Sequence, residues 1–253
     1  MYWYDGNLID SWQLQLEVNE PGLCYGATSF STMRVYDCSL DHPLTSWQSH
    51  CDRLQAAITA FDWQPPDWHK LRQGAEILLE HFAVLRLTIF ADGKEWVTGR
   101  NLPRDLAQRQ AKGITAWIAQ DSLYRRELPQ YKTGNYLSAY LAREQALKLK
   151  AQEAILVDTQ GNWLETSTGN LWGWQDNCWY TPTLDSGILP GIARSRWLRF
   201  FRHHQVAVQE NIWTPEFVAQ LEALAYSNCV VDFVPIESVF GREKRTIYAL
   251  KRP

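Results

Sequence analysis

The sequence lacks the patterns that mark several large classes of protein. Its five cysteines are an odd number, widely spaced, and no Cys-x-x-Cys pair occurs, which disfavours a disulfide framework and a structural zinc site. The six histidines show no ligand spacing, so we expect no bound metal, and a metal-dependent hydrolase is a weak alternative. Neither a Walker loop nor a Gly-x-Gly-x-x-Gly segment is present, which disfavours the common nucleotide-binding folds.

No hydrophobic run is long enough to cross a membrane. The most apolar stretch, residues 77–90, is interrupted by Glu80, His81 and Arg86, and the N-terminus lacks the layout of a signal peptide. The formal net charge of −3 gives no general attraction for nucleic acid or for an anionic membrane. We therefore expect a cytoplasmic protein that acts on a small molecule and has no nucleic-acid or membrane partner.

The length and composition allow two domains. The chain has 253 residues, 45% of them hydrophobic, and short strand patterns alternate with helical ones, as is typical of a mixed α/β fold. Residues 105–112 are polar and without a strong period, and we interpret them as a linker between a small domain at 1–104 and a larger one at 113–253. The C-terminus, 241–253, is basic and is expected to form a solvated edge strand and tail.

One lysine, Lys132, stands at a turn that leads directly into a predicted helix. Pro129 precedes it, Gly134 follows, and apolar residues recur near helical spacing over 135–150. A lysine in a partly dry pocket loses its proton more easily than a solvated one and can bond covalently to a carbonyl. Most single lysines are solvated surface charges, so this interpretation depends on the residues that accompany Lys132.

Three further features can act with this lysine. Glu165 ends a strand that should be largely buried, where a carboxylate is costly unless it is paired. Gly191, Ile192 and Ala193 begin a predicted helix, and the N–H groups of such a terminus can bind a phosphate. Arg53, on a predicted helix of the first half, can grip a phosphate with two N–H groups. Taken singly, these features can also be a solvent-facing glutamate, a plain loop-to-helix junction and an exposed arginine.

Together the four parts suit pyridoxal 5'-phosphate, and their local sequences resemble the class IV aminotransferase family of fold-type IV enzymes. The resemblance rests on His-x-x-Arg-Leu at Arg53, Tyr-Lys-Thr-Gly-Asn-Tyr at Lys132 and Glu-x-x-x-x-Asn-Leu at Glu165. It implies a small α/β domain followed by a larger pseudo-barrel domain, and a homodimer with the cofactor in the cleft between the domains. It also implies that Lys132 is the catalytic residue bonded to the cofactor and that Glu165 keeps the ring nitrogen protonated. The residues implied for the phosphate are Arg53, Gly191, Ile192 and Ala193, with Asn228 nearby.

The reaction is a finer question, and the residues favour a lyase over a transaminase. Residues 179–185, the short length and Asn228 are most similar to aminodeoxychorismate lyase, which releases pyruvate and forms p-aminobenzoate for folate synthesis. Residues 85–90 are more similar to branched-chain transaminases, so an amino-acid transaminase is the alternative.

Several positions depart from the transaminase pattern. Phe30 stands where D-amino-acid transaminases place a tyrosine of their carboxylate trap, which counts against that activity. Ala193 and Cys229 stand where transaminases commonly offer a hydroxyl to the phosphate, so those contacts should come from the backbone alone. Arg34 and Arg86 are the candidates for binding substrate carboxylates. The departures keep open a third interpretation, an inactive protein that retains the fold as a scaffold.

Overall fold

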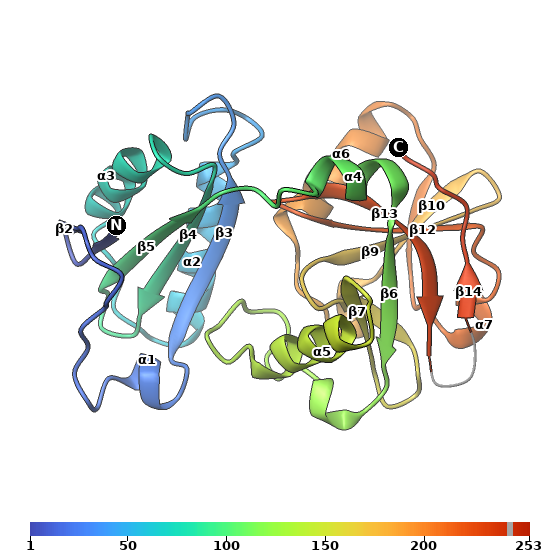
Figure 1. The fold of residues 1–253 in the computed structure, drawn as a ribbon, viewed down its shortest axis with the longest axis horizontal. Helices are drawn as coiled ribbons and strands as arrows, with labels where there is room; N and C mark the ends of the chain where they lie inside the picture. Colours follow the sequence, from blue (N-terminus) through green and yellow to red (C-terminus); the bar gives the residue numbers. More distant parts are fainter. Residues whose placement is uncertain (242–244) are drawn as a thin grey trace. The chain divides into compact units, whose positions relative to one another are not determined.

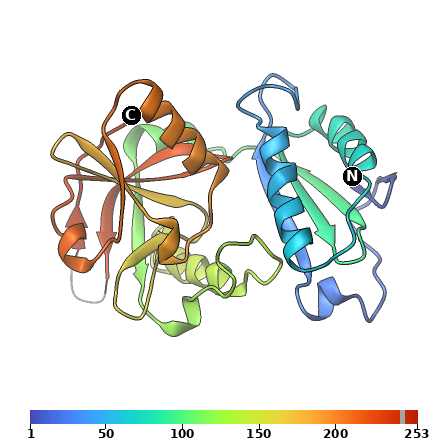
Figure 2. The same ribbon diagram turned by 180° about the vertical axis from the view of Figure 1, so that it is seen from behind.

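The computed structural model describes residues 1–241 and 245–253, and the contacts among them divide the chain into two compact units (Figures 1 and 2). The first unit is Met1–Pro103 with Tyr131–Tyr136, and the second is Arg104–Gln130 with Leu137–Pro253. The segment that carries Lys132 therefore belongs to the first unit, whereas the sequence interpretation placed it in the larger domain. Of the expected basic tail, 242–244 lies outside the described residues.

The first unit is built on a five-stranded antiparallel sheet in the order β2-β1-β5-β4-β3. Its strands are β1 (Tyr2–Tyr4), β2 (Asn7–Ile9), β3 (Thr28–Arg34), β4 (Val84–Phe90) and β5 (Glu95–Arg100). Its helices are α1 (Pro21–Cys24), α2 (Trp47–Ala60) and α3 (Trp68–Leu79). The carboxylate of Asp67 accepts hydrogen bonds from the first N–H groups of α3, which fixes where that helix begins.

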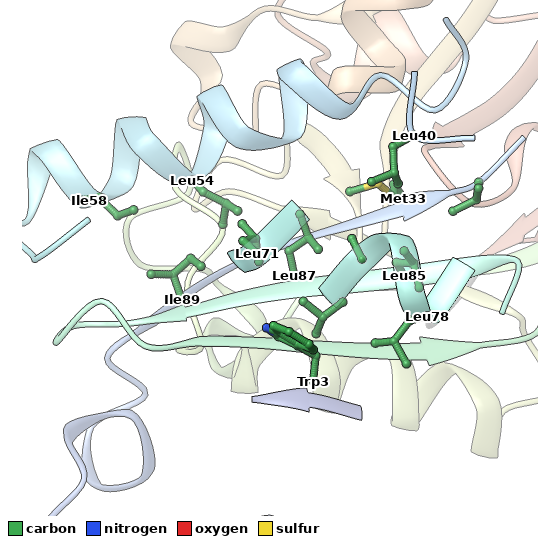
Figure 3. Packing of buried hydrophobic residues seen from close by; sticks show 13 residues of the cluster. Trp3, Met33, Leu40, Leu54, Ile58, Leu71, Leu78, Leu85, Leu87 and Ile89 are labelled. Atoms are coloured by element: carbon green, nitrogen blue, oxygen red, sulfur yellow. The ribbon is translucent and has the colours of Figure 1, made fainter. Parts of the chain in front are cut away.

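Alternation along β3 and β4 separates a core face of this sheet from an opposite face. Met33, Leu85 and Leu87 point into the core, where Leu54 of α2 and Leu71 of α3 pack against them (Figure 3). Each fully buried aliphatic side chain contributes roughly 1.5–3 kcal/mol. Because successive strand residues point to opposite faces, this core holds the other face of β3 and β4, with its polar and aromatic side chains, in a fixed position.

The second unit contains a nine-stranded sheet, six strands of which close into a ring. The ring runs β9-β12-β13-β6-β7-β8, and β8 pairs back onto β9. Strands β10 and β11 extend from β9, and β14 pairs with β13. The strands are β6 (Ile114–Ala119), β7 (Glu153–Val157), β8 (Trp163–Thr166), β9 (Asn170–Gln175), β10 (Cys178–Pro182), β11 (Val208–Asn211), β12 (Ala223–Asn228), β13 (Asp232–Phe240) and β14 (Arg245–Ile247). The predicted mixed α/β class with a barrel-like larger unit is confirmed.

The helices of the second unit are α4 (Leu106–Lys112), α5 (Leu137–Lys148), α6 (Ile192–His203) and α7 (Pro215–Val218), with single 3-10 turns at η1 (Ser122–Tyr124) and η2 (Leu184–Ser186). The linker predicted at 105–112 is wrong, because most of it is α4, inside the second unit. This helix buries only Leu106, and Arg109 pairs with Asp105 one turn earlier at 2.8 Å. A helix with one buried residue leaves no hydrophobic period in the sequence. None of the described helices is long and apolar enough to cross a membrane.

Candidate active site

Lys132 lies on a short extended segment that pairs with β3, an edge strand of the first sheet. The N–H of Phe30 donates to the carbonyl of Lys132 at 2.8 Å. Two residues later, the N–H of Gly134 donates to the carbonyl of Thr28 at 2.7 Å. A Cβ at position 134 would lie 2.4 Å from the hydroxyl of Thr28, so only glycine allows this approach. The segment is therefore held by backbone hydrogen bonds rather than left as a surface loop.

The amine of Lys132 is bordered by two aromatic rings. Its Nζ lies 4.8 Å from the ring centroid of Phe30 and 4.6 Å from that of Tyr136. The same amine donates to the hydroxyl of Tyr136 at 3.4 Å, and the two rings meet edge to face at 5.6 Å. The half-buried Lys132 therefore has the partly dry, aromatic surroundings that suit a reactive amine rather than a solvated one.

Arg86 on β4 lies against the ring of Phe30, the same ring that Lys132 approaches. Its guanidinium carbon lies 3.7 Å from the centroid of Phe30, and its Nε donates to Thr88 at 3.4 Å. Arg86 as a whole keeps exposed surface, but protein atoms crowd its guanidinium, and this loss of water lowers the pKa of Arg86, while Tyr136 opposes the change. Since the ordinary pKa of arginine lies far above neutral pH, the group remains a cation.

Arg34 lies near Arg86 on the same face of the sheet. Thr32 is the cross-strand partner of Arg86, and Arg34 is two residues further along β3, which makes the two arginines diagonal neighbours. Diagonal neighbours lie roughly 7–8 Å apart at the backbone. The guanidinium of Arg34 stacks over Tyr36 at 4.6 Å. Among the described residues, neither arginine has an ion pair with a carboxylate.

Glu165 on β8 is the paired, buried carboxylate that the sequence pattern indicates. It is 5% exposed, so the solvent-facing alternative is wrong. One carboxylate oxygen binds the guanidinium of Arg126, and the other accepts from the Asn170 amide at 3.4 Å and the Leu189 N–H at 3.2 Å. No sequence pattern indicates Arg126, which is 39 residues away from its partner. The one signal in the sequence that could have pointed to Arg126 is that a buried carboxylate needs a cationic partner.

The start of α6 has the features of an anion site. Among the described residues, no side chain caps this terminus, and its dipole and first N–H groups favour a negative charge. Gly191 approaches Asn170 so closely that a Cβ would lie 1.9 Å from the amide oxygen, which leaves no room for any other residue. The Asn170 amide also donates to the carbonyl of Leu189 at 2.9 Å, fixing the chain before the helix. Ile192 and Ala193 follow and are both buried.

Asn228 is used inside its own turn. Its side-chain oxygen accepts from the N–H groups of Val230 at 2.9 Å and Val231 at 3.0 Å. Its amide nitrogen donates to the carbonyl of Thr168 at 3.3 Å. The residue therefore shapes the backbone between β12 and β13, and we expect it to act on a ligand through that backbone. Arg53 is half-buried on α2.

The predicted residues fall into two groups, one in each unit. The first unit holds Phe30, Arg34, Arg53, Arg86 and Lys132, and the second holds Glu165, Gly191, Ile192, Ala193 and Asn228. Each group by itself has features that fit a part of pyridoxal phosphate. In the first unit, an amine on a fixed segment suits the aldehyde. In the second unit, a buried, paired acid suits the ring nitrogen, and the uncapped start of α6 suits the phosphate.

Comparison with known proteins identifies the family. The model of the family "Amino-transferase class IV" matches residues 28–239. The aminodeoxychorismate lyase of Vibrio harveyi is 20% identical over 261 residues, covering 97% of this chain and 93% of the relative. The branched-chain-amino-acid aminotransferase of Pseudomonas aeruginosa is 25% identical over 263 residues, covering 95% and 85%. The pyridoxal-phosphate-bound form of a hypothetical aminotransferase from Mycobacterium tuberculosis shares the fold, with a TM-score of 0.82 at 19% identity, covering 96% of this chain and 92% of that one. The family model spans most of the sequence, so this chain belongs to the class IV aminotransferases, a family of enzymes that use pyridoxal phosphate.

Proposed function

We propose that the protein is a 4-amino-4-deoxychorismate lyase, which releases pyruvate and forms p-aminobenzoate. The observation that carries the proposal is the pair of arginines, Arg34 and Arg86, on one face of the first sheet, where Arg86 and Lys132 lie against the same ring of Phe30. The substrate carries two carboxylates, one on the ring and one on the enolpyruvyl group. Two cations that have no carboxylate partner among the described residues suit such a dianion, because guanidinium groups bind carboxylates with two parallel hydrogen bonds.

The proposed roles follow from what each side chain touches. Pyridoxal phosphate, when bound, draws electrons from the carbon that carries the substrate amine and makes the proton on that carbon removable. Lys132 Nζ takes that proton and returns one to the departing pyruvate group. Tyr136 orients the amine through the contact of its hydroxyl with Nζ, and Phe30 keeps water from one side of it.

The remaining residues bind and orient. Glu165, bound by Arg126 and two N–H donors, is the acid placed to favour a protonated ring nitrogen. The backbone N–H groups of Ile192 and Ala193, with Arg53, take the phosphate. Asn228 contributes through the turn that it shapes.

An amino-acid transaminase is the second candidate. The similarity to branched-chain transaminases and the sequence of β4 support it. In that reaction Lys132 would carry a proton between the two carbons that flank the substrate nitrogen, and pyruvate elimination would not occur. Arg34 and Arg86 would then face a single carboxylate, or the two carboxylates of an acidic amino acid.

An assay with purified, cofactor-loaded protein separates the candidates. The protein is given aminodeoxychorismate, and p-aminobenzoate is followed by fluorescence while pyruvate is followed by a coupled reduction. A panel of amino acids with keto-acid acceptors is tested in parallel. We expect equal amounts of p-aminobenzoate and pyruvate from the first substrate and little transamination. Transamination without p-aminobenzoate would overturn the lyase proposal.

The inactive scaffold is tested by colour. Protein that binds the cofactor at Lys132 should be yellow, and borohydride should bleach it and fix the cofactor to the one peptide that contains this residue. The variant Lys132→Ala is the matched control and should carry no label. We further propose a homodimer that works in the cytoplasm, as the family resemblance implies. Size-exclusion chromatography with light scattering would show twice the chain mass.

A further inference from the structure

The second unit contains a buried carboxyl group that the proposed reaction does not use. Glu153, at the start of β7, is 3% exposed and accepts hydrogen bonds from Ser167 Oγ at 2.6 Å and Thr168 Oγ1 at 2.5 Å. Burial raises the pKa of Glu153 above its ordinary value of 4.5, while the two hydroxyls and the charge of Arg143 oppose the rise. A buried ionisable group is costly, so its presence in this position needs a structural reason.

The hydrogen bonds continue from this carboxyl to a second loop. Thr168, in the hairpin between β8 and β9, donates to Glu153 and accepts from the Asn228 amide at its Oγ1 (3.4 Å) and its carbonyl (3.3 Å). Asn228 in turn holds the N–H groups of Val230 and Val231. One chain of donors therefore runs from the turn between β12 and β13, through the hairpin, to the buried carboxyl.

Close backbone approaches lock the same loops to the start of α6. A Cβ on Gly169 would lie 2.3 Å from the carbonyl of Ser227, and the next residue, Asn170, leaves no space beside Gly191. Asp232, at the end of the turn, accepts hydrogen bonds from side chains of α6. The hairpin, the turn and the helix terminus therefore interlock, and a shift of one moves the others.

We propose that Glu153 is a positioning residue for the phosphate of the cofactor, acting through Thr168 and Asn228 on the loops at 166–170 and 228–231. This inference rests on the proposed phosphate role of the α6 terminus, and it does not depend on which reaction the enzyme catalyses. Loss of these hydrogen bonds between Glu153, Thr168 and Asn228 should loosen the phosphate end of the site. The amine of Lys132, which belongs to the other unit, should be unchanged.

The test compares pyridoxal phosphate with pyridoxal, which has the same aldehyde and ring but no phosphate. Binding of each to the full-length cofactor-free protein is followed by absorbance for wild type, Glu153→Ala, Thr168→Val and Thr168→Ser. The control is Ser238→Ala, which removes a hydroxyl that pairs with Thr115 at 3.0 Å elsewhere in the same unit. We expect Glu153→Ala and Thr168→Val to lower the affinity for pyridoxal phosphate about tenfold or more, as loss of buried hydrogen bonds does. Thr168→Ser keeps the hydroxyl, so its affinity for pyridoxal phosphate should be about that of wild type.

The affinity for pyridoxal should stay the same in all of these proteins, as should both affinities in the control. An equal loss for both compounds, or a lower melting temperature with unchanged affinity for pyridoxal phosphate, would overturn the proposal. Thr168→Val covers the case in which Glu153→Ala does not fold. Failure to form p-aminobenzoate would overturn the lyase proposal but not the role of Glu153. That role is tested by the affinities for pyridoxal phosphate and pyridoxal, which are measured without any reaction.

Discussion

Removal of Arg126 should destabilise the protein strongly, because it takes away the guanidinium group that binds the buried carboxylate of Glu165. The two side chains are only 5% and 6% exposed, so solvent does little to screen the pair. Breaking a buried ion pair by deleting one partner typically costs about 3–5 kcal/mol. The Asn170 amide and the Leu189 N–H remain on the carboxylate, so we expect the lower end of that range for Arg126→Met. For a chain of this size, roughly 2–4 °C of melting temperature accompanies each kcal/mol, which gives a fall of about 6–12 °C.

The double variant Arg126→Met with Glu165→Gln separates the ion pair from simple packing. With no charge left to bury, it should regain most of the loss, since neutral replacement of both partners of a buried pair is often close to neutral. The matched control is Lys94→Met, which breaks the more exposed pair with Asp92, and such pairs contribute under about 1 kcal/mol. Denaturant unfolding of wild type, the single variants Arg126→Met and Glu165→Gln, the double variant and the control gives the coupling energy directly. Additive losses, or a loss for Arg126→Met no larger than the control, would refute the reasoning.

Three further outcomes follow from the same structure. Gly191→Ala should weaken cofactor binding at least about tenfold and cost about 1–3 kcal/mol of stability, because its Cβ collides with Asn170; titration with pyridoxal phosphate and thermal melting measure both. The raised pKa of Glu153 means that the native state holds a proton that the unfolded chain has released. The stabilisation that this bound proton provides is complete below pH 4.5 and is lost as the pH rises through the native pKa of Glu153. Glu153→Gln cannot lose this proton, so its free energy of unfolding should fall less than that of wild type over the same pH interval. Burial raises the pKa of the Cys51 thiol to about 11, so a thiol reagent at neutral pH should modify exposed Cys24 well before Cys51, and equal rates would contradict the burial.

Much of the fold was predictable because its signals are local. The helix predicted from the turn after Lys132 is α5, and the helix predicted after Gly191 is α6. Turn residues, capping and apolar periodicity act over a few positions, and the sequence displays them directly. The prediction of a linker at 105–112 was wrong because α4 lacks such a local signal. This helix is held by an ion pair and by the packing of Leu106, and neither produces an apolar period in the sequence.

The parts of the site that the sequence did not indicate depend on long-range contacts. Arg126 pairs with Glu165, and nothing next to either residue shows that they meet. The chain from Glu153 through Thr168 to Asn228 crosses three separate strands and loops. Asn228 was expected near the phosphate, and its amide group shapes the turn between β12 and β13. The role of such polar residues is fixed by partners that only the folded chain supplies.

The location of Lys132 is the clearest case, because the chain leaves the second unit only for Tyr131–Tyr136 and returns at Leu137. The hydrogen bonds that hold this segment reach back about a hundred residues to β3. Contacts of such sequence separation carry a loop-closure cost. The position of the Lys132 amine therefore depends on the first sheet as well as on its own segment. It follows that a variant that disturbs the pairing of this segment with β3 but keeps Lys132, such as Gly134→Ala with a Cβ 2.4 Å from the hydroxyl of Thr28, should lose covalent cofactor attachment, measured by borohydride labelling, while the phosphate end of the site stays intact.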